Sequence, residues 1–166
     1  MRYFFLLLFV YGIFFFTSCM KKETYPDIPQ IEFAGWTSIF DTGQFAKKGI
    51  LAITFKDGNG DIGLNPGDTF PPYNKQGDYY YNYLIGYFEK QAGEYVKIDL
   101  DPPFSARIPV LTPDNPNKAI KGLIVDTLSM NPHPLFDTIR FELYIYDRAL
   151  HQSNIIYTPD IILRRR

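Results

Sequence analysis

Thr138-Ile-Arg-Phe-Glu-Leu-Tyr-Ile-Tyr-Asp147 is the stretch that decides the fold. Its apolar residues, Ile139, Phe141, Leu143 and Ile145, alternate with an arginine, a glutamate and two tyrosines. Because successive side chains of a strand point to opposite faces, this spacing predicts a strand that turns one face to a core and the other to solvent.

Other segments repeat this pattern, and no segment after residue 30 has a sustained helical period. The further strand candidates are separated by clusters of Pro, Gly, Asn and Asp. They are Ile31–Trp36, Ile50–Lys56, Tyr80–Glu89, Tyr95–Leu100, Ala106–Val110, Ala119–Leu128 and Asn154–Leu163. Pro159 in the last run predicts an edge or a bulge there. We therefore predict an all-β chain with a single immunoglobulin-like antiparallel β-sandwich of about seven or eight strands.

Length, charge and cysteine content exclude several classes of protein. The chain has 166 residues, which suits one domain. Its 17 Lys and Arg are balanced by 18 Asp and Glu, whereas a nucleic-acid-binding protein would carry a clustered basic excess. A single cysteine excludes an internal disulfide framework and a zinc site built on several cysteines.

The N-terminus has the layout of an export signal. Arg2 precedes an unbroken apolar run at residues 3–16, which is shorter than the about 20 residues needed to span a bilayer. The run ends where Cys19, the only cysteine, stands. A basic start, a short apolar core and small polar residues are typical of a secretory signal, and the alternative is an uncleaved anchor with an incidental cysteine.

Phe16-Thr17-Ser18-Cys19 resembles the lipobox of bacterial lipoproteins, with Phe16 where that family prefers Leu. The resemblance implies that residues 1–18 are a signal peptide that is removed. It also implies that Cys19 is acylated and moors the chain to a membrane, where each buried CH₂ contributes about 0.8 kcal/mol. Met20 follows the cysteine instead of Asp, which in that family implies the outer membrane.

This resemblance sets the expected domain organisation. Residues 19–30 form a lipidated tether, and residues 31–166 form the β-sandwich domain. The side of the outer membrane that the domain faces is left open.

Asp57-Gly-Asn-Gly-Asp-Ile-Gly-Leu-Asn-Pro-Gly-Asp68, directly after a predicted strand, carries the strongest chemical signal. Oxygen-bearing side chains at Asp57, Asn59 and Asp61, with Asp68 further on, suit a hard cation such as calcium. The loop is no EF-hand, because Ile62 replaces the required Gly and a strand precedes it. The alternative is a plain tight turn in which Ile62 and Leu64 anchor the returning chain and the side-chain oxygens bind backbone amides.

A second polar cluster, Asp147–Asn154, follows the strand at Thr138–Asp147. In a sandwich, the loop after the second strand and the loop before the last strand lie at the same end. Asp147 or Asn154 could therefore complete a calcium site, with Asp147 as the preferred candidate. Alternatively, Arg148 neutralises the carboxylates of the first loop, which favours the metal-free turn.

The pairing of a DGxGDIG loop with a late Asp-Arg-x4-Ser-Asn stretch resembles a group of small, mostly uncharacterised bacterial outer-membrane lipoproteins with immunoglobulin-like domains. The likeness covers about residues 30–163. It implies a fold and a location, and it implies no activity.

Six tyrosines are candidates for an aromatic binding face. Four of them share one side of an extended run, and two share the outward side of the strand at Thr138–Asp147. The six are Tyr79, Tyr81, Tyr83, Tyr87, Tyr144 and Tyr146. Aromatic rings on an exposed sheet face suit sugars or protein partners. The alternative is ordinary cross-strand pairing, with the side that holds Ile85 turned to the core.

Catalysis has little support in the sequence. Ser153, His151 and Asp147 could be imagined as a catalytic set, but no nucleophile elbow and no oxyanion loop accompany them. We expect a non-enzymatic, lipid-anchored protein of the cell envelope that binds another envelope protein or a glycan, holds at most a structural calcium and does not bind nucleic acid. The alternative is an envelope hydrolase on a β-sandwich, with a metal at Asp57, Asn59 and Asp61 that activates a water.

Overall fold

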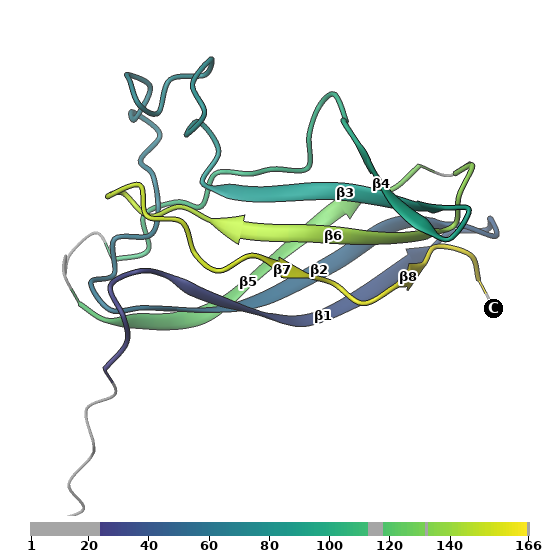
Figure 1. Cartoon of the computed structure of the whole chain (residues 1–166), viewed down its shortest axis with the longest axis horizontal. Coiled ribbons are helices and arrows are strands. Elements are labelled where there is room, and N and C mark those ends of the chain that lie inside the picture. The colour runs from purple at the N-terminus through teal and green to yellow at the C-terminus, as the bar shows by residue number, and fades with distance from the viewer. Residues whose placement is uncertain (1–23, 113–117, 132, 166) are drawn as a thin grey trace, which may run out of the picture.

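The structure is a computed structural model that describes residues 24–112, 118–131 and 133–165 (Figure 1). Cys19 and the predicted signal peptide lie outside the described residues. The described part has eight strands and no helix, so it contains no helix that could cross a membrane. The strands are β1 (Gln30–Phe40), β2 (Ala46–Asp57), β3 (Tyr83–Gln91), β4 (Glu94–Ile98), β5 (Ile120–Ser129), β6 (Thr138–Ile145), β7 (Ile156–Tyr157) and β8 (Ile161–Ile162).

The strands form two antiparallel sheets. One has the order β1-β2-β5, and the other has the order β4-β3-β6-β7, with β8 also paired to β6. Figure 1 shows the two sheets lying one over the other. Immunoglobulin-type sandwiches divide their strands between two sheets in a comparable way, with the third and sixth strands together in one of them. The predicted all-β sandwich is confirmed.

The core fills the space between the sheets and centres on β6. Ile139, Phe141, Leu143 and Ile145, the residues that predicted the strand, are all fully buried. The Phe141 ring lies 5.4 Å from the ring of Trp36 on β1, and 5.9 Å from the ring of Tyr87 on β3. Side chains from both sheets therefore meet at Phe141, and its burial joins the two layers.

Two predicted strands differ from the observed ones. Ala106–Val110 does not form a strand: it makes single bridges from Ala106 to Tyr83 and from Pro109 to Leu64. Pro109 has no N–H to continue a ladder. Asn154–Leu163 is divided into β7 and β8 around Pro159, where the sequence predicted an edge or a bulge. In the gap, the hydroxyl of Thr158 accepts the hydrogen bond of the Phe141 amide at 3.0 Å.

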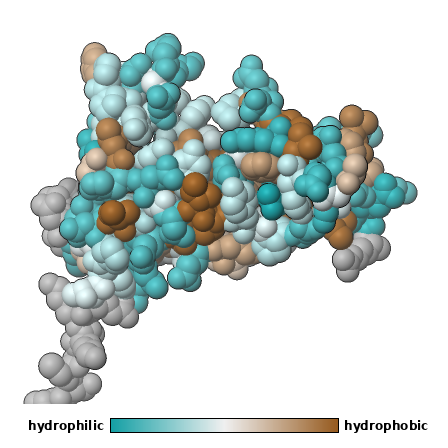
Figure 2. All heavy atoms as spheres, viewed as in Figure 1, coloured by the Kyte–Doolittle hydropathy of each residue, from teal (hydrophilic) through white to brown (hydrophobic). Residues whose placement is uncertain are grey.

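Exposed apolar side chains are scattered over several strands and loops. Figure 2 shows a mostly hydrophilic face on which apolar residues form small, separate patches. On the outer face of β5, Leu123 is 57 % exposed. Val125 on the same face of β5 is 56 % exposed, so the two side chains form a small apolar patch there.

We expect Phe141→Ala to lower the free energy of unfolding by about 3–5 kcal/mol, because the cavity would lie where both sheets meet. Urea unfolding followed by circular dichroism measures the loss. Leu123→Ala is the matched control, and its effect should stay within about 0.5 kcal/mol, as is usual for surface positions. A loss of similar size in both variants would show that Phe141 does not join the sheets.

Candidate functional site

The two loops singled out in the sequence meet at one end of the sandwich, on the left in Figure 1. Asp57 is the last residue of β2 and pairs with Ile120 of β5. Asp147 comes two residues after β6 ends. The amide of Arg148 donates to the carbonyl of Asp61 at 3.2 Å, which fastens the loop after β6 to the loop after β2.

The loop after β2 is packed against other backbone segments. Gly60 has a φ of +69°, and a Cβ there would lie 2.1 Å from the carbonyl oxygen of Lys118. Gly63 has a φ of +121°, and a Cβ there would lie 2.3 Å from the carbonyl oxygen of Pro109. Both positions need glycine for conformation and for space. Between and after them, Ile62 and Leu64 are buried, as the sequence predicted.

Several oxygen atoms of this loop are buried without a hydrogen-bond partner. They are both carboxylate oxygens of Asp57, Oδ1 of Asn59 and Oδ1 of Asp61. Asp57 has no exposed surface at all. The tight-turn interpretation expects these oxygens to bind backbone amides, and no such bond of normal geometry reaches them. Buried polar atoms are nearly always satisfied, so this cluster needs an explanation.

The pKa values of the loop carboxylates also indicate that their charges are not neutralised. Burial, followed by the charges of Asp61 and Asp147, raises the pKa of Asp57 to about 6, against a partial opposing effect of the Ile62 and Asp61 amides. Burial and Asp147 also raise the pKa of Asp61. Three carboxylates thus repel one another at this end of the sandwich.

Asp147 is buried and holds the second loop. Its Oδ1 accepts the amide of His151 at 2.8 Å, and its Oδ2 lies 2.9 Å from Nδ1 of the same histidine. Ser153 does not extend this pair, because its hydroxyl donates to the carbonyl of Asn154 and accepts from the Ile145 amide. Nothing in the described geometry therefore turns Ser153 into a nucleophile for His151.

Asn154 and Asp68 lie in other interactions. The Asn154 side chain binds the amide and the carbonyl of Ile31 at 2.9 Å each, in the manner of a backbone bridge. Asp68 accepts a hydrogen bond from Arg148 Nη1 at 2.6 Å, and that arginine lowers its pKa. The ion pair of Arg148 is thus made with Asp68, and the carboxylate of Asp57 is left without a basic partner.

No motif pointed to Arg107, which the structure places beside the same end. Its guanidinium donates to the carbonyl of Tyr80 at 2.7 Å and to that of Asp68 at 3.0 Å. These contacts fasten the long connection between β2 and β3, which projects from the sheets in Figure 1. Tyr73 in this connection donates to the carbonyl of Arg148 at 2.7 Å. The roles of Arg107 and Tyr73 depend on hydrogen bonds between residues far apart in the chain, so the sequence alone does not show them.

The candidate tyrosine face is divided by the fold. Tyr83 and Tyr87 point into the core beside Ile85 and are 2 % and 8 % exposed, so their prediction as part of an exposed face is wrong. Packing between the sheets, and not residue type, decides which side of an alternating strand is buried. Tyr81 packs edge-on against Tyr80, with their ring centroids 4.9 Å apart.

The remaining three tyrosines form a cluster on the outer face. The ring centroid of Tyr146 lies 5.0 Å from that of Tyr79 and 5.7 Å from that of Tyr144, both edge-on. All three are partly exposed. Burial is the main cause that raises the pKa of both Tyr144 and Tyr146, so both remain neutral hydrogen-bonding groups at neutral pH.

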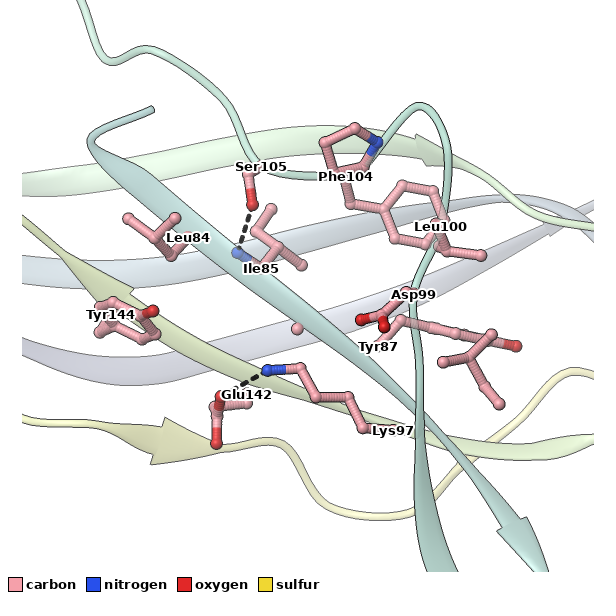
Figure 3. A pocket seen from close by; sticks show the side chains of 13 residues that line it. Leu84, Ile85, Tyr87, Lys97, Asp99, Leu100, Phe104, Ser105, Glu142 and Tyr144 are labelled. Atoms are coloured by element: carbon pink, nitrogen blue, oxygen red, sulfur yellow. Dashed lines mark hydrogen bonds and ion pairs between the residues drawn. The ribbon is translucent and has the colours of Figure 1, made fainter. Parts of the chain in front are cut away.

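A pocket of about 190 Å³ adjoins Tyr144 (Figure 3). Gly86 leaves room in its wall, and Glu142 and Lys97 form an ion pair of 3.7 Å across it. Asp99 also lines it. Figure 3 shows Tyr144 and Glu142 on one side of β3, with Leu100 and Phe104 on the other. An aromatic wall beside charged groups suits a small polar ligand.

A larger cleft of about 660 Å³ opens between β3 and β5. Apolar side chains such as Leu100, Phe104 and Leu128 line it, together with the carboxylates of Glu89 and Asp126. Among its described lining residues none is basic. Its charge therefore favours neutral or cationic ligands over anions.

Comparisons with known proteins identify no relative: no protein-family model, curated protein or solved structure matches the chain. Within the described residues, no group of three or more His, Cys, Asp or Glu side chains is arranged to hold a metal ion. Any cation site here must therefore also use amide or carbonyl oxygens, as calcium sites do.

The raised pKa of Asp57 predicts a pH dependence in metal-free buffer. The pKa is about 6 in the folded chain against an ordinary value of 3.8. The folded state therefore binds the Asp57 proton more strongly than the unfolded state does. The protonated carboxyl contributes its full stability below the ordinary pKa, and this stability is lost as pH rises through 6. The loss by neutral pH is on the order of 3 kcal/mol. Asp57→Asn should abolish it.

Urea unfolding of both proteins between about pH 4 and about pH 7 measures this difference, and other titrating groups cancel because they are common to both. A difference in unfolding free energy that stays constant over this range would contradict the prediction.

Proposed function

We propose that this protein is a lipid-anchored, non-catalytic binding module of the cell envelope, and that its partner is a glycan or an envelope protein. The observation that carries the proposal is the outer face of β6, where the partly exposed tyrosine cluster adjoins a polar pocket. We define this binding face by Tyr79, Tyr144, Tyr146 and the pair Glu142 and Lys97.

The geometry of the binding face favours a glycan as the partner. Tyrosine rings offer flat apolar surfaces that stack on sugar rings, and their hydroxyls add hydrogen bonds. Glu142 forms an ion pair with Lys97 at 3.7 Å and accepts a hydrogen bond from the Tyr157 hydroxyl, and its side chain keeps 16 % of its surface exposed. Charged groups held in place in this way can bind sugar hydroxyls without first rearranging.

The non-catalytic part of the proposal rests on the end loops. The pair of Asp147 and His151 is the feature that favours the alternative, a metal-dependent envelope hydrolase. Both carboxylate oxygens of Asp147 bind His151 and hold the turn, and Ser153 binds backbone groups instead of the histidine. This arrangement is that of a loop brace, which orders the turn after β6.

Attachment to the outer membrane is proposed from Cys19 and its lipobox-like surroundings. The first described residues lie against the domain, because the carbonyl of Pro26 accepts the amide of Gly58 at 2.7 Å. Only a short segment would then separate the acylated cysteine from the folded part. The domain would stand close to the membrane surface with its N-terminal end toward the lipid.

We expect the double substitution Tyr144→Ala and Tyr146→Ala to lower glycan binding by at least about tenfold, because two stacking surfaces of about 1 kcal/mol each are removed. An array of bacterial and plant polysaccharide fragments, probed with the full-length chain in neutral detergent, is the measurement.

The matched control is Leu123→Ala on the other sheet, which should bind as the natural protein does. Binding unchanged in the tyrosine variant would contradict the proposed face. Release of shortened oligosaccharides from bound fragments would instead support the hydrolase.

Cys19→Ser should move the protein out of the membrane fraction and abolish incorporation of radiolabelled palmitate, since a serine cannot form the thioether that carries the lipid. Mass spectrometry of the natural protein should find an acylated N-terminal Cys19. An intact Met1 would contradict the lipid anchor.

A further inference from the structure

Four oxygen atoms at the end of β2 and in the loop after it are buried and accept no hydrogen bond of normal geometry. They come from three side chains within five residues, Asp57, Asn59 and Asp61. Burying an ionised carboxylate without a partner costs several kcal/mol, so a cation that binds the fully buried Asp57 would stabilise the fold at neutral pH.

The described surroundings do not supply that partner. Arg148 is bound to Asp68 and to the carbonyl of Gly63. Arg107 is bound to the carbonyls of Tyr80 and Asp68. His151 is bound to Asp147. The charges nearest to Asp57 are those of two further carboxylates, Asp61 and Asp147, and both oppose its ionisation.

The composition of the cluster selects the kind of ion. Its donors are carboxylate and amide oxygens, which hard cations prefer and zinc does not. Calcium takes six to eight oxygens at about 2.3–2.6 Å in flexible geometry, and it accepts carbonyl oxygens from glycine-rich loops. Magnesium demands a near-ideal octahedron of shorter bonds, which an irregular loop does not provide.

We propose that Asp57, Asn59 and Asp61 bind one calcium ion together with backbone carbonyl oxygens of their own loop. Asp147 of the loop after β6 is outside the ligand set, because both of its oxygens bind His151. The ion would order the loop after β2, to which the amide of Arg148 fastens the loop after β6. Asp68 is outside the site, because Arg148 already neutralises it.

This proposal is independent of the binding face, since it concerns the end of the sandwich and is tested without a glycan. Thermal unfolding of the full-length chain in neutral detergent is followed by Trp36 fluorescence, with about 1 mM calcium or with chelator. A site with a dissociation constant near 10 µM would raise Tm by about 5–10 °C. Magnesium at the same concentration should give a much smaller shift.

Asp57→Asn separates an ion site from a merely structural role. In chelator this variant should melt higher than the natural protein, because a buried charge is removed. In calcium it should lose the shift, because a ligand is removed. Asp68→Asn is the matched control in the same loop and should keep the shift.

Equilibrium dialysis with calcium measures the stoichiometry on the natural protein, so the test does not depend on any variant folding. One bound ion per chain supports the site. No bound calcium together with no shift in Tm, or a full shift in Asp57→Asn, would overturn it.

Discussion

A carboxylate buried at the end of an inner strand constrains this whole end of the sandwich. Asp57 closes β2 beneath the loops that join β2 to β3 and β6 to β7, and it has neither solvent nor a base to bind. The loop around it cannot open without losing the anchors Ile62 and Leu64. A negative charge in such a place destabilises the fold unless a cation accompanies it. The proposed calcium ion would offset this cost and order the loop after β2.

The same end organises the long connection between β2 and β3. Arg148 links the candidate ion site to this connection. Its amide binds the carbonyl of Asp61 in the site, and its side chain binds Asp68 further along the connection. Tyr73 then binds the carbonyl of Arg148. An ion at Asp61 would therefore also order part of the projecting connection, through a chain of direct contacts and not through a change in the sheets.

The binding face lies on different residues and depends on different physics. Tyr144 and Tyr146 point outward because their neighbours Leu143 and Ile145 are committed to the core around Phe141. Edge-on contacts among the tyrosines hold the rings in place, which lowers the entropy lost when a partner binds. A rigid aromatic surface beside a charged pair thus follows from the packing on the opposite side of the same strand.

The sequence by itself determined the elements with clear alternation, an irregularity at Pro159 and the anchoring by Ile62 and Leu64, because these depend on local periodicity and backbone chemistry. It also marked Asp57, Asn59, Asp61 and Asp147 as oxygen donors. It could not say that Tyr83 and Tyr87 are buried, since both sides of that run are apolar or aromatic and only packing against the other sheet chooses between them. Nor could it pair Arg148 with Asp68 or leave the oxygens of Asp57 without a donor. Those outcomes depend on distances between segments far apart in the chain, which only the tertiary structure fixes.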